Sequence, residues 1–177
     1  SAFYQSGLES FEVPANCSSI GNSAFQSCSS LKSITFAAGS QLATIGYRAF
    51  AYSGLESIEI PASVATIDSR SNYDSSYGAF YYCSALRSVT FAAGSQLTQL
   101  APYTFYQSGI ESITFGSDSS LLSIPDSYFS SGYSSLKSVS FGARSQLSTI
   151  GSSAFYQSGL ESFEVPANCS SIGNSAF

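Results

Sequence analysis

The sequence predicts a β-rich solenoid whose parallel strands stack coil upon coil. Residues 1–25 recur without a substitution as residues 153–177, an offset of 152 positions. Within that period an Ala-Phe pair, or a close variant of it, returns at intervals of 22 to 30 residues. Apolar residues hold fixed places in each interval but are too few to form a core alone. Repeats that bury their apolar side chains only against neighbouring repeats are typical of solenoids.

Six units form one super-repeat, and a seventh begins the next copy. Each unit places a first strand of the form Leu-x-Ser-Ile-x-Phe after the Ala-Phe pair, then a turn, then a second apolar pair. Neither end shows the polar capping unit that a soluble solenoid needs, so residues 1–177 are expected to form a single segment of a longer array. The units span about residues 2–23, 24–48, 49–78, 79–103, 104–127, 128–153 and 154–175.

The repeated line Ala-Phe…Leu-x-Ser-Ile-x-Ile-Pro-x-x-Val-x-x-Ile-Gly resembles the BspA-type leucine-rich repeat of bacterial and protist surface proteins. The stretches 8–21 and 55–67 match it best, and the unit with Thr104 and Pro125 departs from it most. The resemblance covers the whole chain and implies a leucine-rich-repeat coil. It also implies an extracellular or cell-surface location and adhesion to host or neighbouring cells. It implies no catalytic residue.

The composition excludes several classes of protein. Six basic and eleven acidic residues give a net charge of −5, which offers no electrostatic footprint for nucleic acid. No run of 18 apolar residues exists, so no membrane span is expected. Hydrophobic residues make up 44% of the chain and recur at a strict period, which favours a folded array over disorder.

An enzyme is not expected, nor is a cofactor or a metal site. The chain contains no His, so a Ser or Cys nucleophile lacks its commonest base. No Cys-x-x-Cys spacing and no glycine-rich phosphate loop are present. The carboxylate pairs Glu9/Glu12 and Glu56/Glu59 are expected to lie in a regular ladder rather than in a pocket.

Charge alternates at the second position of the first strand. In stacked parallel strands, about 4.8 Å apart, these side chains form a column in which each charge has opposite charges above and below. Exposed pairs contribute only about 0.2–1 kcal/mol each, so the column is interpreted as a device that sets the register. Because a super-repeat has an even number of units, six, its last ladder residue, Lys137, has the opposite charge to the first of the next copy, Glu161, and the alternation continues. The residues of this charge ladder are Glu9, Lys32, Glu56, Arg87, Glu111, Lys137 and Glu161.

Two further features follow from stacking. The Phe of each Ala-Phe pair, from Phe3 to Phe177, is expected to form a continuous column in the core, where aromatic pairs add to burial. Gly39, in the Ala-Ala-Gly-Ser turn, is expected to adopt a backbone conformation that favours glycine.

An insertion at residues 68–77 interrupts the third unit. Insertions in solenoids form loops on one face and often carry binding features. Acidic and amide side chains there could hold a cation, although their spacing fits no calcium loop, and a solvated loop is the simpler interpretation. With the neighbouring tyrosines, the candidate binding loop comprises Asp68, Asn72, Asp74, Tyr77, Tyr81 and Tyr82.

Asn16 and Asn168 each begin an Asn-Cys-Ser sequence, which is an acceptor pattern for N-glycosylation. If Cys17 faces inward, Asn16 faces outward. Both a glycosylation site and a plain polar turn residue remain open at these positions.

The four cysteines favour buried thiols. Cys28 and Cys83 occupy the same place in units two apart, about 10 Å along the stack, which is too far for a disulfide. A bond between Cys17 and Cys28 remains geometrically open. Cys169 is the copy of Cys17.

Two functions fit the sequence. The first is an extracellular structural fibre or filament, whose partner is the chain itself through end-to-end continuation. The second is a cell-surface adhesin whose partners are glycans or host extracellular-matrix proteins. The unsubstituted copy and the continuous charge register favour the fibre.

Overall fold

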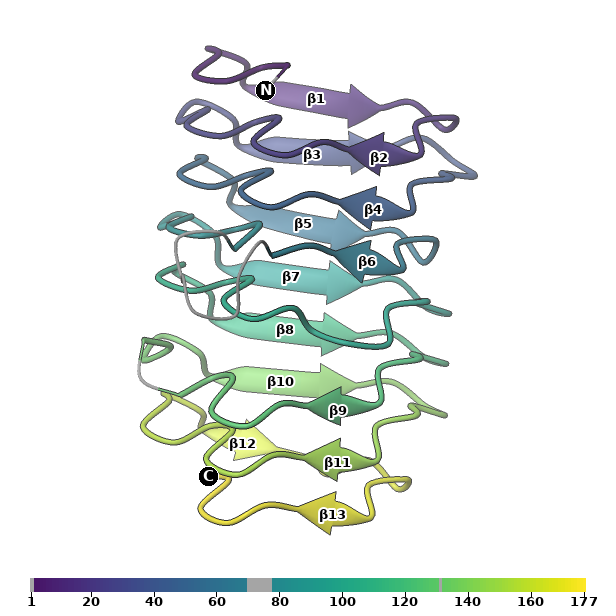
Figure 1. The fold of residues 1–177 in the computed structure, drawn as a ribbon, viewed down its shortest axis with the longest axis vertical. Helices are drawn as coiled ribbons and strands as arrows, with labels where there is room; N and C mark the ends of the chain where they lie inside the picture. Colours follow the sequence, from purple (N-terminus) through teal and green to yellow (C-terminus); the bar gives the residue numbers. More distant parts are fainter. Residues whose placement is uncertain (1, 70–77, 131) are drawn as a thin grey trace.

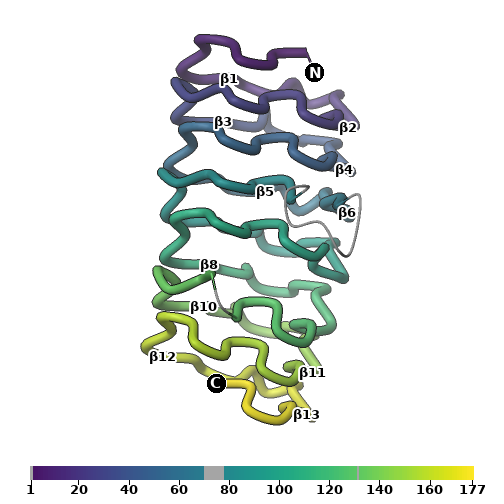
Figure 2. Tube along the Cα trace, turned by 60° about the vertical axis from the view of Figure 1, so that its left-hand side comes forward, coloured from purple at the N-terminus to yellow at the C-terminus, as the bar shows by residue number. Residues whose placement is uncertain are grey.

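The computed structural model describes residues 2–69, 78–130 and 132–177, and it confirms the parallel β-solenoid. The described residues form thirteen short strands and no helix. The coils stack along one axis, with the N-terminus at one end and the C-terminus near the other (Figures 1 and 2). The chain thus winds one repeat unit after another, as the sequence predicts.

The first strand of each unit contributes to one side of the solenoid. All pairings on this side are parallel, and serine faces serine in each, as in Ser10 with Ser33 and Ser112 with Ser138. The apolar residues of these strands alternate inward, as the burial of Ile58 and Ile60 shows. The strands are β1 (Ser10–Val13), β3 (Ser33–Phe36), β5 (Ser57–Ile60), β7 (Ser88–Phe91), β8 (Ser112–Phe115), β10 (Ser138–Phe141) and β12 (Ser162–Phe163).

In most units the last residue of the second apolar pair and the residue before it form a two-residue strand on the opposite side of the coil (Figure 1). Unit 4 forms no such strand, so this side divides into the sheets β2-β4-β6 and β9-β11-β13. The strands are β2 (Ser19–Ile20), β4 (Thr44–Ile45), β6 (Thr66–Ile67), β9 (Ser123–Ile124), β11 (Thr149–Ile150) and β13 (Ser171–Ile172).

Tight turns around the Ala-Phe pairs form the edge between the two sides. Residues with positive φ flank the pair, as at Ser23 (55°) and Ser27 (60°). The turn bonds to the following coil, since the Phe25 N–H donates to the Ala49 carbonyl at 2.7 Å. Gly39 has a φ of 74°, which confirms the expectation for the turn after β3.

The phenylalanine column forms the core through most of the stack. Phe50 is fully buried, with its ring nearly parallel to Phe25 at 5.4 Å and to Phe80 at 5.2 Å between centroids. Phe177, the last residue of the sequence, is 55% exposed, and its ring continues the column by stacking on Phe155 at 5.4 Å. At the other end, Phe3 is half-buried.

Replacing a central phenylalanine should weaken the stack far more than replacing the exposed one. Phe50→Ala removes a buried ring and leaves a cavity, so we expect it to lower the free energy of unfolding by about 3–5 kcal/mol. Phe177→Ala, the matched control in the same Ala-Phe motif, should change it by less than about 1 kcal/mol. Urea denaturation followed by circular dichroism measures both. Equal losses would show that the column is not the core.

Candidate functional site

The seven charged residues of the ladder lie one above another. Backbone hydrogen bonds of 2.8 to 3.2 Å join each to the next, from Lys32 N–H to Glu9 carbonyl through to Glu161 N–H to Lys137 carbonyl. These bonds hold the backbones of the charged residues in one column on the side of the first strands.

Close ion pairs form only in the middle of this column. Glu111 accepts from Lys137 Nζ at 3.1 Å, and its other oxygen lies 3.4 Å from Arg87 Nε. The three side chains are 40–55% exposed, so each pair is of the weak surface kind. Among the described residues, the other ladder side chains, Glu9, Lys32, Glu56 and Glu161, form no ion pair within 4.0 Å.

The contribution of a ladder residue to the free energy of unfolding should therefore depend on its place in the column. Glu111→Gln removes two ion pairs, and we expect it to lower the free energy of unfolding by about 0.5–2 kcal/mol in dilute buffer. Glu56→Gln is the matched control, since it alters the net charge equally and removes no ion pair. The difference between the variants should shrink in about 1 M salt because of screening. Urea denaturation at both salt concentrations tests this, and equal losses would contradict it.

A further ion pair joins two turns on consecutive coils. Arg144 contacts Asp118 through two bonds, Nε to Oδ1 at 2.5 Å and Nη2 to Oδ2 at 2.7 Å. The Arg144 hydrogen bond lowers the pKa of the Asp118 carboxyl. Both residues have a φ of 58°, at the turn positions that Gly39 and Gly94 occupy in other units. The sequence analysis did not predict this ion pair. It could have been predicted from the two charged residues, of opposite sign, at a turn position where other units have glycine.

The candidate binding loop is described only in part. Asp68 is exposed, and its backbone N–H donates to the Ile45 carbonyl at 2.8 Å. Asn72, Asp74 and Tyr77 lie outside the described residues. Among the described residues, no group of three His, Cys, Asp or Glu side chains could hold a metal ion.

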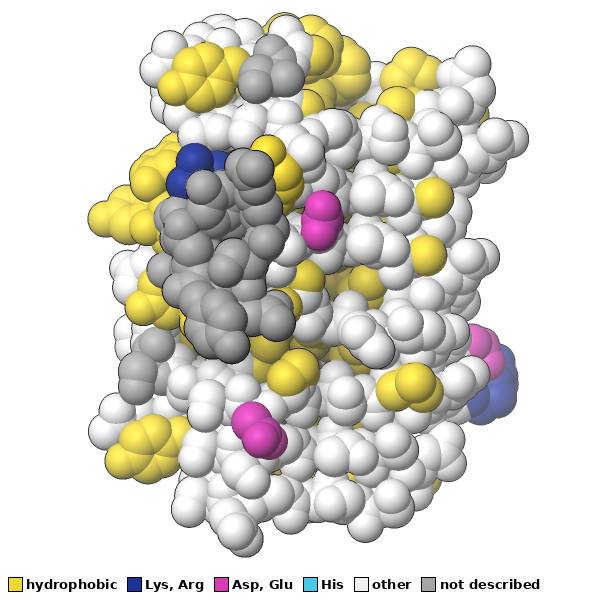
Figure 3. Space-filling model, in the orientation of Figure 1, with side chains coloured by type: hydrophobic (Ala, Val, Ile, Leu, Met, Phe, Trp, Pro, Cys, Tyr) yellow, Lys and Arg dark blue, Asp and Glu magenta, His cyan; other side chains and the backbone are white. Residues whose placement is uncertain are grey.

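Tyr81 and Tyr82 belong to a cluster of tyrosines beside the insertion. The Tyr52 ring lies 5.4 Å from that of Tyr81 and 5.3 Å from that of Tyr82. Tyr81 also stacks on Tyr106 at 6.5 Å. Burial and the neighbouring Tyr52 hydroxyl raise the pKa of Tyr81. Tyr52 and Tyr82 are both more than 40% exposed, so the cluster presents aromatic surface to solvent. Elsewhere, the face in Figure 3 shows few charged side chains.

The sequon asparagines are both exposed, but Asn168 is also bound. Its side-chain nitrogen donates to the Ser145 carbonyl of the preceding coil at 2.7 Å. This is the nitrogen that a glycan would modify. Glycosylation of Asn16 and Asn168 stays a prediction.

All four cysteines are free thiols. Cys28 and Cys83 are buried, and each donates to the Phe carbonyl of the preceding coil, at 2.9 Å to Phe3 and 3.0 Å to Phe50. Burial raises the pKa of the Cys83 thiol to about 11. Cys17 and Cys169 are half-buried, so the expectation of fully buried thiols fails for these two.

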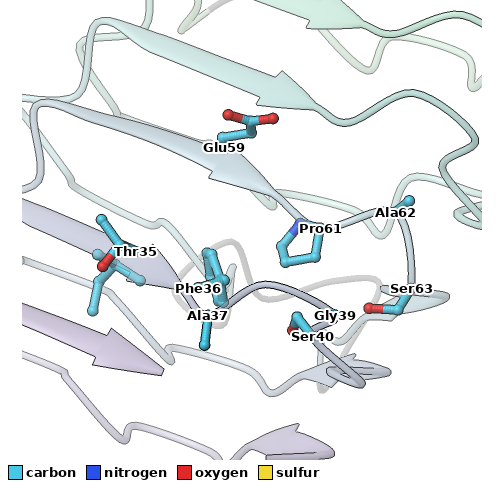
Figure 4. Close-up of a pocket in the computed structure, with 10 residues that line it drawn as sticks. Thr35, Phe36, Ala37, Gly39, Ser40, Glu59, Pro61, Ala62 and Ser63 are labelled. Carbon is cyan, nitrogen blue, oxygen red and sulfur yellow. The ribbon is translucent and has the colours of Figure 1, made fainter. Parts of the chain in front are cut away.

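Two grooves open between coils on the side of the first strands. The Pro61 groove, of about 520 Å³, lies between β3 and β5 and is lined by Thr35, Phe36, Ser40, Glu59 and Pro61, among others (Figure 4). The Pro166 groove, of about 540 Å³, lies between β10 and β12 and is lined by the corresponding residues Phe141, Ser145, Glu164 and Pro166, and by Arg144.

The grooves correct one expectation from the sequence. Glu59 was expected to lie in a regular ladder, but it lines the Pro61 groove, and Glu164, the copy of Glu12, lines the Pro166 groove. The reason is a break in the strand pairing. No pairing joins β3 to β5, and only two residues of β12 pair with β10. The sequence feature that could have predicted this break is the proline after the strand, Pro61 after β5 and Pro166 after β12.

Comparison with known proteins agrees with this architecture. A family model described as the BspA type leucine-rich repeat region, in six copies, matches residues 1–77 and 76–177. The chain belongs to this family. The match extends over the whole chain, as the resemblance in the repeated line predicts. No curated protein matches the chain.

The described residues include no helix long and apolar enough to cross a membrane.

Three solved structures are similar to this leucine-rich repeat chain. A leucine-rich repeat protein from Bacteroides ovatus is 22% identical with a TM-score of 0.62, over 94% of this chain and 45% of that one. The pneumococcal vaccine antigen PcpA is 26% identical with a TM-score of 0.43, and the match covers 95% of this chain and 47% of that one. A leucine-rich cell surface protein from Faecalibacterium prausnitzii is 18% identical with a TM-score of 0.41, and the match covers 96% of this chain and 51% of that one. The chain spans about half the length of these proteins.

Proposed function

We propose that this leucine-rich repeat chain is part of an extracellular or cell-surface structural filament, built from super-repeats stacked end to end. The observation that carries the proposal is the junction between the two copies. Residues 153–177 dock on the preceding coil through strand pairing, backbone hydrogen bonds and ring stacking of the kinds that also join other coils, although only two residues of β12 pair with β10. Ser162 pairs with Ser138, the Glu161 N–H donates to the Lys137 carbonyl at 3.0 Å, and Phe155 stacks on Phe129 at 5.3 Å.

The two identical segments also differ in how they are covered. Val13, Ile20 and Phe25 are at most 5% exposed because the following coil lies against each of them, as Phe50 does against Phe25. Their copies Val165, Ile172 and Phe177 are 42%, 50% and 55% exposed. The same apolar face is therefore buried wherever the sequence provides a following coil.

A glycine in the Ser-Gly link supports the same view. A Cβ atom on Gly159 would collide with the Ser134 carbonyl of the preceding coil, whereas one on Gly7 would meet nothing within 4 Å. The two glycines occupy the same place in identical segments. The glycine is therefore required by close backbone approach at Gly159 but not at Gly7.

This difference gives a test of how the junction is built. Gly159→Ala should force the last coil away from Ser134 and lower the protection of the amides of residues 154–177 in hydrogen exchange by about tenfold or more, because the clash is with backbone. Gly7→Ala, the matched control in an identical segment, should leave exchange throughout the chain nearly unchanged. If both variants behave alike, the close approach at the junction does not hold the copies together.

The filament itself is tested by electron microscopy of native material averaged along the axis. Six coils at about 4.8 Å predict an axial repeat near 29 Å. Long, unbranched filaments with that repeat are the expected result, and the alternating charge ladder would then continue through every junction. Discrete short, curved particles would overturn the filament.

A second candidate is adhesion, which the tyrosine cluster favours. Exposed aromatic side chains beside an insertion are the kind of surface that binds glycans or proteins such as those of a host matrix. A filament and an adhesin are compatible, because tyrosines on the side of the stack leave the coil junctions free.

A further inference from the structure

We propose that the Pro61 groove and the Pro166 groove are binding sites for a basic side chain, lysine or arginine, of a partner polypeptide. The inference concerns the side of the solenoid rather than its ends. It therefore does not depend on whether copies assemble into a filament.

The grooves arise from a missing hydrogen-bond donor. In other coils the residue after the first strand donates its N–H to the last strand residue of the preceding coil. Examples are Ala92 to Ile60 at 3.0 Å, Gly116 to Phe91 at 2.9 Å and Gly142 to Phe115 at 2.7 Å. Pro61 and Pro166 stand at this position and carry no N–H. The carbonyls of Phe36 and Phe141 thus lose this bond, and the coils separate at the ends of their strands.

The burial of the phenylalanines supports this account. Phe91 and Phe115, each followed by a coil that donates the N–H, are at most 1% exposed. Phe36 and Phe141 occupy the same place in their strands, yet they are only partly buried. The grooves beside Pro61 and Pro166 therefore expose part of a phenylalanine ring together with a backbone carbonyl that can accept a hydrogen bond.

The chemistry of the grooves fits a long cationic side chain. The aliphatic stem of lysine or arginine packs on apolar surface, here the phenylalanine and proline rings, while its charged head seeks acceptors. Glu59 is the sole charged residue lining the Pro61 groove, so the groove is acidic. Thr35, Phe36 and Ser40 also line the groove; Phe36 has a backbone carbonyl and Thr35 a hydroxyl, while the Ser40 hydroxyl already accepts from the Leu42 N–H at 3.3 Å.

The two grooves are not equally acidic. The Pro166 groove contains Glu164 but also Arg144, whose guanidinium is already bonded to Asp118. In the Pro61 groove Gly39 takes the place of Arg144. The Pro61 groove is therefore the stronger site, since no Lys or Arg is among the described residues that line it.

The test is a titration of the 15N-labelled 177-residue chain with capped trilysine in low-salt buffer, followed by NMR. Shifts are expected at the amides of Ala37, Ala62 and Ser63, and weaker ones at Ala167. Glu59→Gln should raise the dissociation constant measured at Ala62 about fivefold. Pro61→Ala leaves the charge unchanged but restores an N–H for Phe36, and it should weaken binding at least as much.

Glu12→Gln is the matched control, because it lowers the negative charge equally at a residue that lines neither groove. It should leave the constant unchanged. Equal weakening by Glu12→Gln and Glu59→Gln would reveal general attraction to an acidic protein and overturn the proposal. A capped peptide with norleucine in place of lysine, or the neutral sugar cellobiose, should produce no shifts. If either binds as well as trilysine, the grooves do not select a cation.

Discussion

Backbone hydrogen bonds between consecutive coils are the constraint on which the rest of this structure depends. They act on every side of the coil: Lys32 donates to Glu9, Gly46 to Ile20, and Phe25 to Ala49, with lengths of 2.7 to 2.8 Å. Once these bonds fix the spacing, each side chain lies over its counterpart in the next unit. Phenylalanine then stacks on phenylalanine, serine faces serine, and like charges would face each other unless their signs alternated.

This constraint explains why so little specific side-chain chemistry is needed. Each coil contributes only a few apolar residues, and the described core runs as one cluster along the axis rather than around a centre. Because each unit contacts chiefly its neighbours, adding a unit adds both a core layer and a set of backbone bonds. An array of this kind gains stability by lengthening, which is the physical reason that an unsubstituted copy would suit the proposed structural role.

The sequence predicted what repeats and missed what does not. The strands, the buried phenylalanines from Phe25 to Phe155 and the turn at Gly39 were predictable because each follows from one unit's own pattern. The grooves were not, because Pro61 acts on the carbonyl of Phe36, a residue 25 positions earlier in another coil. Arg144 likewise contacts Asp118 across 26 positions, at turn residues that follow no apolar period. Burial at the ends of the stack depends on neighbours rather than on the residue, as Phe25 and Phe177 show.

A regular ladder offers every ligand the same surface at each step, so selective binding on its side requires a local break. Proline provides such a break at the end of a strand, while the rest of the coil stays bonded to its neighbour. Beside the Pro61 groove the Glu56 N–H still donates to the Lys32 carbonyl at 3.2 Å, and beyond the turn Ser63 Oγ donates to the Leu42 carbonyl at 2.8 Å. The strands therefore part between two points that remain bonded. Each of the two grooves also brings a glutamate with its proline, Glu59 with Pro61 and Glu164 with Pro166. The Glu-x-Pro pattern thus opens the groove and sets its charge, so an array could carry the proposed binding sites while its stacking continues.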